Sequence, residues 1–226
     1  MIELYHCINA RSFRPLWTLE EMELPYSLKL LPFPPRAYAP HYKEINPLGT
    51  IPLFIDGAVR MTESSAISHY LAVRYGPSPL GVDPAEDDYG AFLNWTHFGE
   101  ATLTFPQTLV LRYGIFEPAE RRQPAVAQDY AKWFLARLRA VEARLDGRDY
   151  LCAGRFTVAD ISVGYALVLA GMIGLSEEFG PNVAAYRARL EARDGFRRAV
   201  RAQEEAAAAI GTLDGFGRPL EAEDRR

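Results

Sequence analysis

Glu63 and Ser64 stand at the predicted start of a helix, where residues 62–71 read TESSAISHYL. The first N–H groups of a helix have no partner within it and the positive end of its dipole lies there, so a carboxylate binds well. Ser64 could hold such a carboxylate while Glu63 accepts a hydrogen bond from a neighbouring ammonium group. Ser64 could also act only as a helix cap, and the residues alone leave both roles open.

A second group of hydrogen-bond donors lies in the loop over residues 7–14, ahead of the first predicted helix. Ser12 carries an O–H, Asn9 carries amide N–H groups, and Arg11 and Arg14 add positive charge. A helix N-terminus, a nearby cation and a donated hydrogen bond each lower the pKa of a thiol. The loop is therefore suited to stabilising a thiolate, although Ser12 also occupies the position of a helix N-cap.

Strands and helices must position these groups, and the apolar spacing predicts both kinds of element in the first third of the chain. Asp56 and Gly57 form a strong signal for a hairpin turn. The predicted order is β-α-β-α-β-β-α, with strands over residues 2–5, 26–31, 53–55 and 58–61, and helices over 14–23, 41–45 and 62–75.

Residues 76–84 hold three prolines and two glycines and form the best candidate for a linker. The chain beyond it reads as helical throughout. Thr157 and Asp160 have the spacing of a capping box, which we interpret as structural, at the start of a buried helix. We therefore predict an α/β domain over residues 1–80 and an all-helical domain over 85–226, with loosely ordered residues in the last fifteen or so. An amphipathic stripe in the helical half is formed by Val126, Tyr130, Phe134, Leu138, Val141 and Leu145.

Three segments resemble motifs of the cytosolic glutathione transferases. They are LYHCINARSFRPLWTLEEMELPY over residues 4–26, NPLGTIPLFIDG and MTESSAISHYL over 46–57 and 61–71, and FTVADIS over 156–162. The resemblance covers roughly residues 1–210. It implies a thioredoxin-like N-terminal domain followed by a helical bundle, conjugation of glutathione to small hydrophobic electrophiles, and a homodimer.

The resemblance also implies how glutathione, the expected co-substrate, is bound. Members of this family have a cis peptide bond before the proline that Pro52 matches, which turns the backbone N–H and C=O of Ile51 outward to pair with an extended peptide. Glu63 and Ser64 match the residues that hold the amine and the carboxylate of the γ-glutamyl group. We therefore predict a cis bond between Ile51 and Pro52 and a glutathione site over these residues.

Thr50 departs from the family pattern. Relatives often carry Lys or Gln at this position to hold the glycine end of glutathione, whereas Thr is shorter and uncharged. The partner of the glycine carboxylate therefore stays open, and His41, Lys43 and Arg36 in the preceding segment are weaker candidates.

Three residues are candidates for activating the glutathione thiol. Asn9 aligns where many relatives have the activating serine, Ser12 lies near the helix start where other relatives place theirs, and Tyr5 is a third donor within the first strand. Some relatives instead use a loop cysteine that forms a mixed disulfide with glutathione. Cys7 stands eight residues before Pro15 rather than at the helix start, so we interpret it as a small buried residue.

Two alternatives to transferase activity are left open. One is glutathione-dependent reduction of disulfides or peroxides, and the other is a non-catalytic protein that binds glutathione or hydrophobic ligands. The electrophile of a transferase would bind in an apolar pocket of the helical half. Our best candidates for that pocket are Phe105, Leu109, Arg112 and Tyr113, although the aromatic residues of this region could also be simple core.

Composition excludes several other classes of protein. The net charge of −4 and the pI of about 5.7 argue against nucleic acid and anionic membranes as partners. The longest uncharged apolar stretch, residues 161–176, is shorter than the roughly 20 residues that span a bilayer. The two cysteines form no CxxC pair and the histidines lack metal-ligand spacing. We expect a cytoplasmic protein without a signal peptide, a disulfide or a metal.

Overall fold

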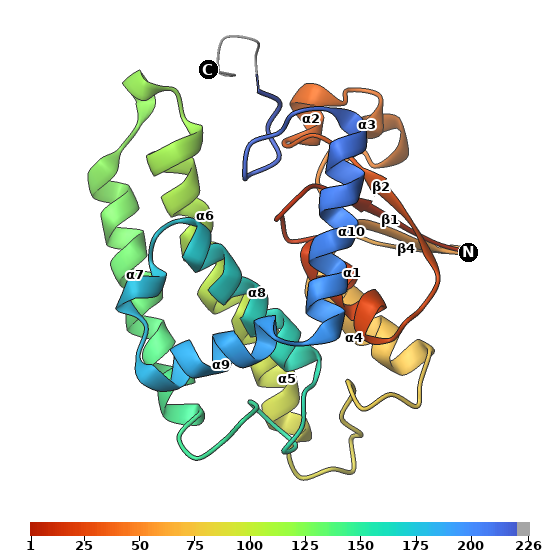
Figure 1. Ribbon diagram of the computed structural model, residues 1–226, viewed down its shortest axis with the longest axis vertical. Coiled ribbons are helices and arrows are strands. Elements are labelled where there is room, and N and C mark those ends of the chain that lie inside the picture. The colour runs from red at the N-terminus through yellow and green to blue at the C-terminus, as the bar shows by residue number, and fades with distance from the viewer. Residues whose placement is uncertain (221–226) are drawn as a thin grey trace. The chain divides into compact units, whose positions relative to one another are not determined.

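The protein is described here by a computed structural model of residues 1–220, whose path is shown in Figure 1. The chain divides into two compact units. Unit 1 combines residues 1–78 with residues 192–220, and unit 2 is Pro79–Glu191. The chain leaves unit 1 within the region predicted as a linker, and it returns to unit 1 for its last helix.

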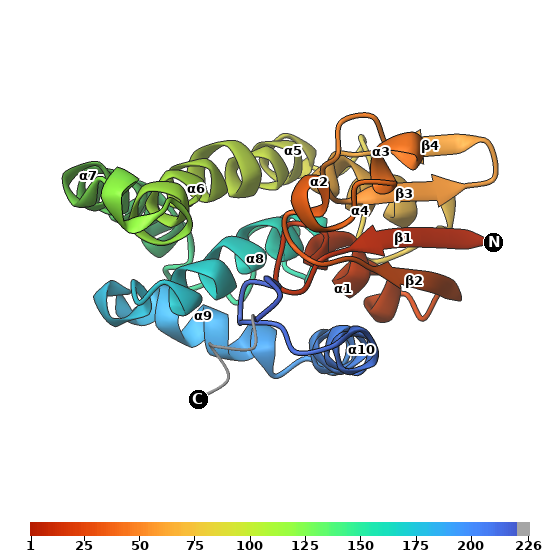
Figure 2. The same ribbon diagram turned by 90° about the horizontal axis from the view of Figure 1, so that it is seen from above.

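Unit 1 is built on a four-stranded mixed sheet with the strand order β2-β1-β3-β4, which can be followed in Figure 2. Strands β1 and β2 are parallel, whereas β3 is antiparallel to both β1 and β4. This sheet confirms the predicted thioredoxin-like order. The elements of unit 1 are β1 (Ile2–His6), α1 (Phe13–Glu21), β2 (Tyr26–Leu30), α2 (Pro35–Tyr38), α3 (Tyr42–Ile45), β3 (Leu53–Asp56), β4 (Val59–Met61), α4 (Ser64–Arg74) and α10 (Asp194–Ile210).

Alternation along β1 decides which side chains enter the core of unit 1. Ile2, Leu4 and His6 are buried, whereas Glu3 and Tyr5 alternate with them and are half-buried. Successive side chains of a strand point to opposite faces of the sheet. His6 therefore enters the core as part of an apolar row, and its imidazole needs partners there.

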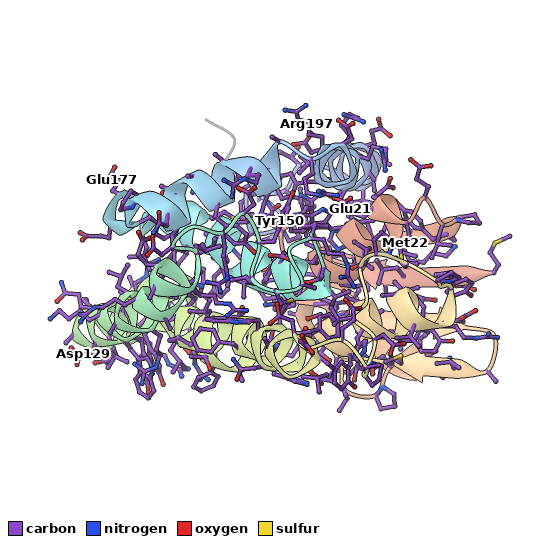
Figure 3. All side chains as sticks on the ribbon, turned by 90° about the horizontal axis from the view of Figure 1, so that it is seen from below. Glu21, Met22, Asp129, Tyr150, Glu177 and Arg197 are labelled. Carbon is purple, nitrogen blue, oxygen red and sulfur yellow. The ribbon has the colours of Figure 1, made fainter. Side chains whose placement is uncertain are left out.

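Helix α10 packs against α1 rather than joining the helical unit, which differs from the predicted domain boundary. The ring of Phe196 lies 5.4 Å from the ring of Phe13 and 5.0 Å from that of Trp17. The guanidinium of Arg193 donates two hydrogen bonds of 2.8 Å to the carboxylate of Glu21, which Figure 3 labels beside the ribbon of α10. Burial of this aromatic face explains why α10 belongs to unit 1.

Residues 212–220 fold back as a turn, whereas the sequence predicted loose order for this region. The carboxylate of Asp214 accepts hydrogen bonds from the backbone N–H groups of Phe216 and Arg218 and from the Arg218 guanidinium. The carbonyl of Gly217 accepts a 2.7 Å hydrogen bond from the N–H of Phe33. The Asp214 hydrogen bonds close the turn on itself, and the bond from Phe33 joins it to the segment after β2. Residues 221–226, also within the predicted loose tail, lie outside the described residues.

Unit 2 is a bundle around α8, whose residues are nearly all buried. The carboxylate of Asp160 accepts hydrogen bonds from the backbone N–H groups of Thr157 (2.8 Å) and Leu151 (3.0 Å) and from the hydroxyl of Tyr186 (2.7 Å). The predicted capping box is therefore confirmed. The elements of unit 2 are α5 (Tyr89–His97), η1 (Phe98–Thr104), α6 (Phe105–Leu111), η2 (Arg112–Phe116), η3 (Ala119–Arg121), α7 (Pro124–Arg144), α8 (Val158–Met172), η4 (Ser176–Glu178) and α9 (Pro181–Glu191).

Two π-helical segments, η1 and η2, flank α6, and the sequence did not predict them. Pro106 lies just after η1 and has no N–H to donate to the preceding turn. Gly99 lies so close to α8 that an added Cβ would stand 2.5 Å from the backbone of Ser162. A widened helical turn accommodates both constraints. Within residues 1–220, none of the helices has the length and apolar character needed to cross a membrane.

We expect Asp160→Ala to lower the free energy of unfolding by about 3 kcal/mol, because four buried donors, the Thr157 hydroxyl among them, lose their acceptor. Urea unfolding at neutral pH measures this change. Asp149→Ala is the matched control, since the Asp149 side chain is 74% exposed and surface substitutions usually change stability by less than about 0.5 kcal/mol. Equal effects of the two substitutions would contradict a structural role for Asp160.

Candidate functional site

The hydroxyl of Ser12 lies inside unit 1 and is completely buried. Its Oγ stands 2.7 Å from Nδ1 of His6 and accepts a 3.3 Å hydrogen bond from the backbone N–H of Cys7. Helix α1 begins at the next residue, but the Ser12 side chain makes no capping bond to it. The hydroxyl thus links the end of β1 to the loop instead of facing solvent.

The imidazole of His6 is neutral at physiological pH. The ring is fully buried, and burial lowers its pKa to about 4, although a hydrogen bond to the Gln203 side chain acts in the opposite direction. A neutral imidazole carries one N–H and one acceptor nitrogen. Its partners therefore decide which nitrogen holds the proton.

Gln203, on α10, settles that choice. Its side-chain oxygen Oε1 lies 3.0 Å from the backbone N–H of Asn9 and 3.1 Å from Nε2 of His6. An amide oxygen only accepts hydrogen bonds, so Nε2 of His6 must carry the proton and Nδ1 must accept one. The Ser12 hydroxyl consequently donates its one proton to Nδ1 of His6.

Asn9 is half-buried and has the left-handed backbone conformation, with a φ of 56°. Its side-chain oxygen Oδ1 accepts a 2.7 Å hydrogen bond from Nε2 of Gln203, and its Nδ2 donates a 2.9 Å hydrogen bond to the carbonyl of Gly215. Asn is one of the few residue types that tolerates this conformation. Both ends of the carboxamide are therefore held in place, within the loop predicted to stabilise a thiolate.

Tyr5 and Cys7 have different surroundings from Asn9. Tyr5 is half-buried, and its ring lies 5.5 Å from the ring of Tyr42 in α3. Cys7 is fully buried, and its Sγ lies 3.7 Å from the carbonyl of Pro32. Burial raises the pKa of the Cys7 thiol far above its ordinary value, so the thiolate form that reacts is suppressed.

The start of α4 brings together the acidic and hydroxyl groups predicted to bind an amino-acid head group. Glu63 is exposed and occupies the N-cap position, while Ser64 is only 3% exposed. The Nη1 atom of Arg14 donates a 3.1 Å hydrogen bond to the hydroxyl of Ser64. Arg14 and the helix N-terminus both contribute positive potential at this point.

Sequence reasoning placed Arg14 where the first loop meets the first predicted helix and missed its contact with α4. Arg14 lies within α1 and is fully buried. Helix α1 meets α4 through a 2.8 Å hydrogen bond from Thr18 to Ser68 as well. One signal in the sequence could have indicated this contact. Arg14 is the only charged residue between positions 13 and 19, and a buried charge requires a specific partner.

The segment before β3 has the predicted backbone geometry. The peptide bond between Ile51 and Pro52 is cis, as the sequence predicted. The carbonyl of Thr50 accepts 2.8 Å hydrogen bonds from the Tyr42 hydroxyl and from Nδ2 of Asn46. Thr50 itself is exposed and Ile51 is half-buried.

The three weaker candidates of this region, Arg36, His41 and Lys43, are all exposed. His41 also lies 3.4 Å from the carboxylate of Glu44. These positions leave the partner of a glycine carboxylate unassigned.

The four residues predicted to line an electrophile pocket all lie on α6 and η2 of unit 2. Phe105 is 52% exposed, Leu109 and Tyr113 are half-buried, and Arg112 is exposed. The guanidinium of Arg112 donates a 3.1 Å hydrogen bond to Glu117 and lies 5.5 Å from the ring centroid of Tyr113. A carboxylate therefore already compensates the charge of Arg112.

An open hollow of about 400 Å³ lies on α5 and η1, and none of the four predicted residues lines it. Its lining is formed by Leu93, Asn94, His97, Phe98, Ala101 and Thr102. In the part of the chain that the structure describes, no group of three or more His, Cys, Asp or Glu side chains could hold a metal ion.

Two family models match the chain. Residues 10–74 match the N-terminal domain of glutathione S-transferases, and residues 124–189 match the C-terminal domain. Glutathione S-transferase GstB of Escherichia coli is 28% identical over 208 residues, which cover 88% of this chain and 98% of that protein. Glutathione S-transferase 3 of Schizosaccharomyces pombe is 39% identical over 106 residues, which are 46% of this chain and 43% of that protein.

The fold is also similar to that of a solved structure. It is the glutathione transferase URE2P6 from Phanerochaete chrysosporium in complex with oxidized glutathione. The two chains are 25% identical with a TM-score of 0.79, and the match covers 90% of this chain and 96% of the other.

We expect the contribution of His6 to stability to fall as the pH drops from about 6.5 to about 4, because unfolded His6 takes up a proton there that folded His6 does not. Burial raises the pKa of Asp160 to about 6 and acts in the opposite direction, so the His6 contribution is the difference between a His6 variant and the wild type. The free energy of unfolding changes through His6 by at most about 1.4 kcal/mol per pH unit. Urea unfolding of His6→Gln and of the wild type across this range measures the difference. His41→Gln, at an exposed histidine, should keep the wild-type slope. An NMR titration that shows His6 protonating near pH 6.5 would contradict the burial argument.

Proposed function

Because the chain belongs to the glutathione S-transferase family, we propose that it binds glutathione in unit 1 and conjugates its thiolate to small hydrophobic electrophiles. In this reaction the sulfur lone pair forms a bond to an electrophilic carbon, and the thiol proton and any leaving group depart to solvent. The observation that carries the proposal is the carboxamide of Asn9, held at both ends in the loop between β1 and α1.

Asn9 is the residue that we propose as the stabiliser of the thiolate. An amide nitrogen only donates hydrogen bonds, and a hydrogen bond to the charged form lowers the pKa of a thiol. The Ser12 hydroxyl is buried and donates to His6, which favours Asn9 over Ser12. Tyr5 packs against Tyr42 and stays a weaker candidate.

The γ-glutamyl end of glutathione is proposed to bind at the start of α4. The N–H groups there, with Arg14 behind Ser64, suit the carboxylate. The exposed carboxylate of Glu63 suits the ammonium group. Thr50, Ile51 and Pro52 are proposed to contact the remainder of the peptide through the backbone of Ile51.

The electrophile is proposed to bind in unit 2, with Phe105, Leu109, Arg112 and Tyr113 as the candidate contacts. A homodimer and a cytoplasmic location belong to the same proposal. The burial of Cys7 and the raised pKa of its thiol speak against a reductase that uses this cysteine. A non-catalytic role would appear as glutathione binding without turnover of any electrophile.

We expect Asn9→Ala to lower kcat roughly 10- to 100-fold, since a hydrogen bond to a charged group contributes about 1.5–3 kcal/mol. The pKa of the bound glutathione thiol should rise at the same time. Conjugation of a chlorodinitrobenzene and the ultraviolet absorbance of the thiolate as a function of pH measure the two effects. If Ser12→Ala raises the thiol pKa and a folded Asn9→Ala does not, Ser12 is the activating residue.

We expect Glu63→Gln and Ser64→Ala each to raise the KM for glutathione about tenfold or more, with a smaller effect on kcat, because they remove contacts to the non-reacting end. Binding to immobilised glutathione provides a test that needs no turnover. Glu44→Gln is the matched control, since Glu44 is an exposed carboxylate of the same unit. Wild-type affinity in both site variants would refute this placement of the γ-glutamyl group.

A further inference from the structure

We propose that Gln203 is a positioning residue that makes Asn9 turn its amide nitrogen, rather than its oxygen, toward the sulfur of glutathione. This inference rests on the proposed role of Asn9. Gln203 belongs to α10, lies 194 residues after Asn9 in the sequence, and is only 3% exposed. The matched family models end at residue 189, so they do not include it.

Two backbone groups, the N–H of Asn9 and the carbonyl of Gly215, fix the direction of the hydrogen bonds between Gln203 and Asn9. The N–H of Asn9 can only donate, so the atom of Gln203 that faces it must be the oxygen Oε1. The other end of that amide, Nε2, therefore faces Oδ1 of Asn9 and donates to it at 2.7 Å. This leaves the nitrogen end of Asn9 toward the carbonyl of Gly215, which can only accept.

The opposite orientation of Asn9 is excluded by the same contacts. Turning its carboxamide over would place Nδ2 against the N–H donor of Gln203 and Oδ1 against the carbonyl of Gly215. Both contacts would be repulsive in a partly buried site. An outward oxygen would also repel a thiolate, whereas an outward amide nitrogen stabilises it. The orientation of one side chain therefore decides whether the loop favours or disfavours the reactive anion.

Gln203 is itself held by the docking of α10 on α1. The Arg193–Glu21 pair and the aromatic contacts of Phe196 fix the first turn of α10, and Arg198 donates a 3.1 Å hydrogen bond to Glu20 one turn later. The N–H of His6 donates to the same oxygen of Gln203 that Asn9 uses. The amide thus has satisfied partners at both ends and a rigid helix beneath it.

Gln203→Glu tests this role selectively, because a carboxylate keeps the acceptor for His6 and for the backbone of Asn9 but loses the donor to Oδ1. We expect Asn9 to turn over, kcat to fall about tenfold or more, and the pKa of the bound glutathione thiol to rise. Gln203→Leu, which cannot donate at any pH, should show the same rise and covers the case in which the introduced carboxyl stays protonated. Ala199→Gly is the matched control, since it loosens α10 one turn away and should leave the thiol pKa unchanged.

A double-mutant cycle separates positioning from general loss of structure. In the Asn9→Ala background, Gln203→Glu should have no further effect on kcat or on the thiol pKa, because the group that it positions is gone. Equal effects of Gln203→Glu in both backgrounds, or an unchanged thiol pKa in the single variant, would overturn the proposal.

A second readout works even if the protein proves to have no transferase activity. The side-chain amide of Asn9 gives its own NMR signals, and the bond to Gly215 should protect it from exchange with solvent in the wild type. Loss of that protection in Gln203→Glu, with protection retained in Ala199→Gly, supports the proposed orientation. Unchanged Asn9 signals in Gln203→Glu overturn it, whatever the outcome for the proposed function.

Discussion

The hydrogen bonds of Gln203 join α10 to the end of β1 and to the loop that follows it. The arrangement of the candidate site in unit 1 depends on them. A histidine enters the core because of the alternation of β1, and it requires buried partners. Ser12 supplies one partner and α10 supplies the other. The same glutamine then satisfies the backbone and the side chain of Asn9. The hydrogen bonds of the buried His6 imidazole therefore connect β1, the first loop and α10 in one network.

The fold could be predicted where local patterns and tertiary structure agree. Alternation and helical spacing identified the four strands and the helices that cover them, and Thr157 and Asp160 marked the start of α8. The cis bond before Pro52 was predicted by the family resemblance rather than by any local pattern. The π-helical segments were not predicted, because their causes arise only in the packed structure. The close approach of Gly99 to Ser162 is one such cause.

The candidate site was less accessible to sequence reasoning. The motifs located the loop, but Ser12 and Asn9 could not be ranked, since what separates them is burial and the proton of His6. The position of that proton depends on Gln203, a residue nearly 200 positions away. Arg14 was expected to act in its own loop and instead reaches Ser64, because α1 and α4 are neighbours only in the folded unit. Charge pairing between elements distant in sequence leaves little local signal.

The division of the chain has a consequence for how the protein is made. Unit 2 interrupts unit 1 in sequence, so a ribosome completes the whole of Pro79–Glu191 before it adds the helix that finishes unit 1. Contacts between such distant segments must overcome a large loop-closure entropy and form late. A nascent chain would therefore contain His6 and Asn9 long before Gln203, their shared hydrogen-bond partner, is added. The maturation of this site therefore depends on the synthesis of α10, not on that of the first strand and loop alone.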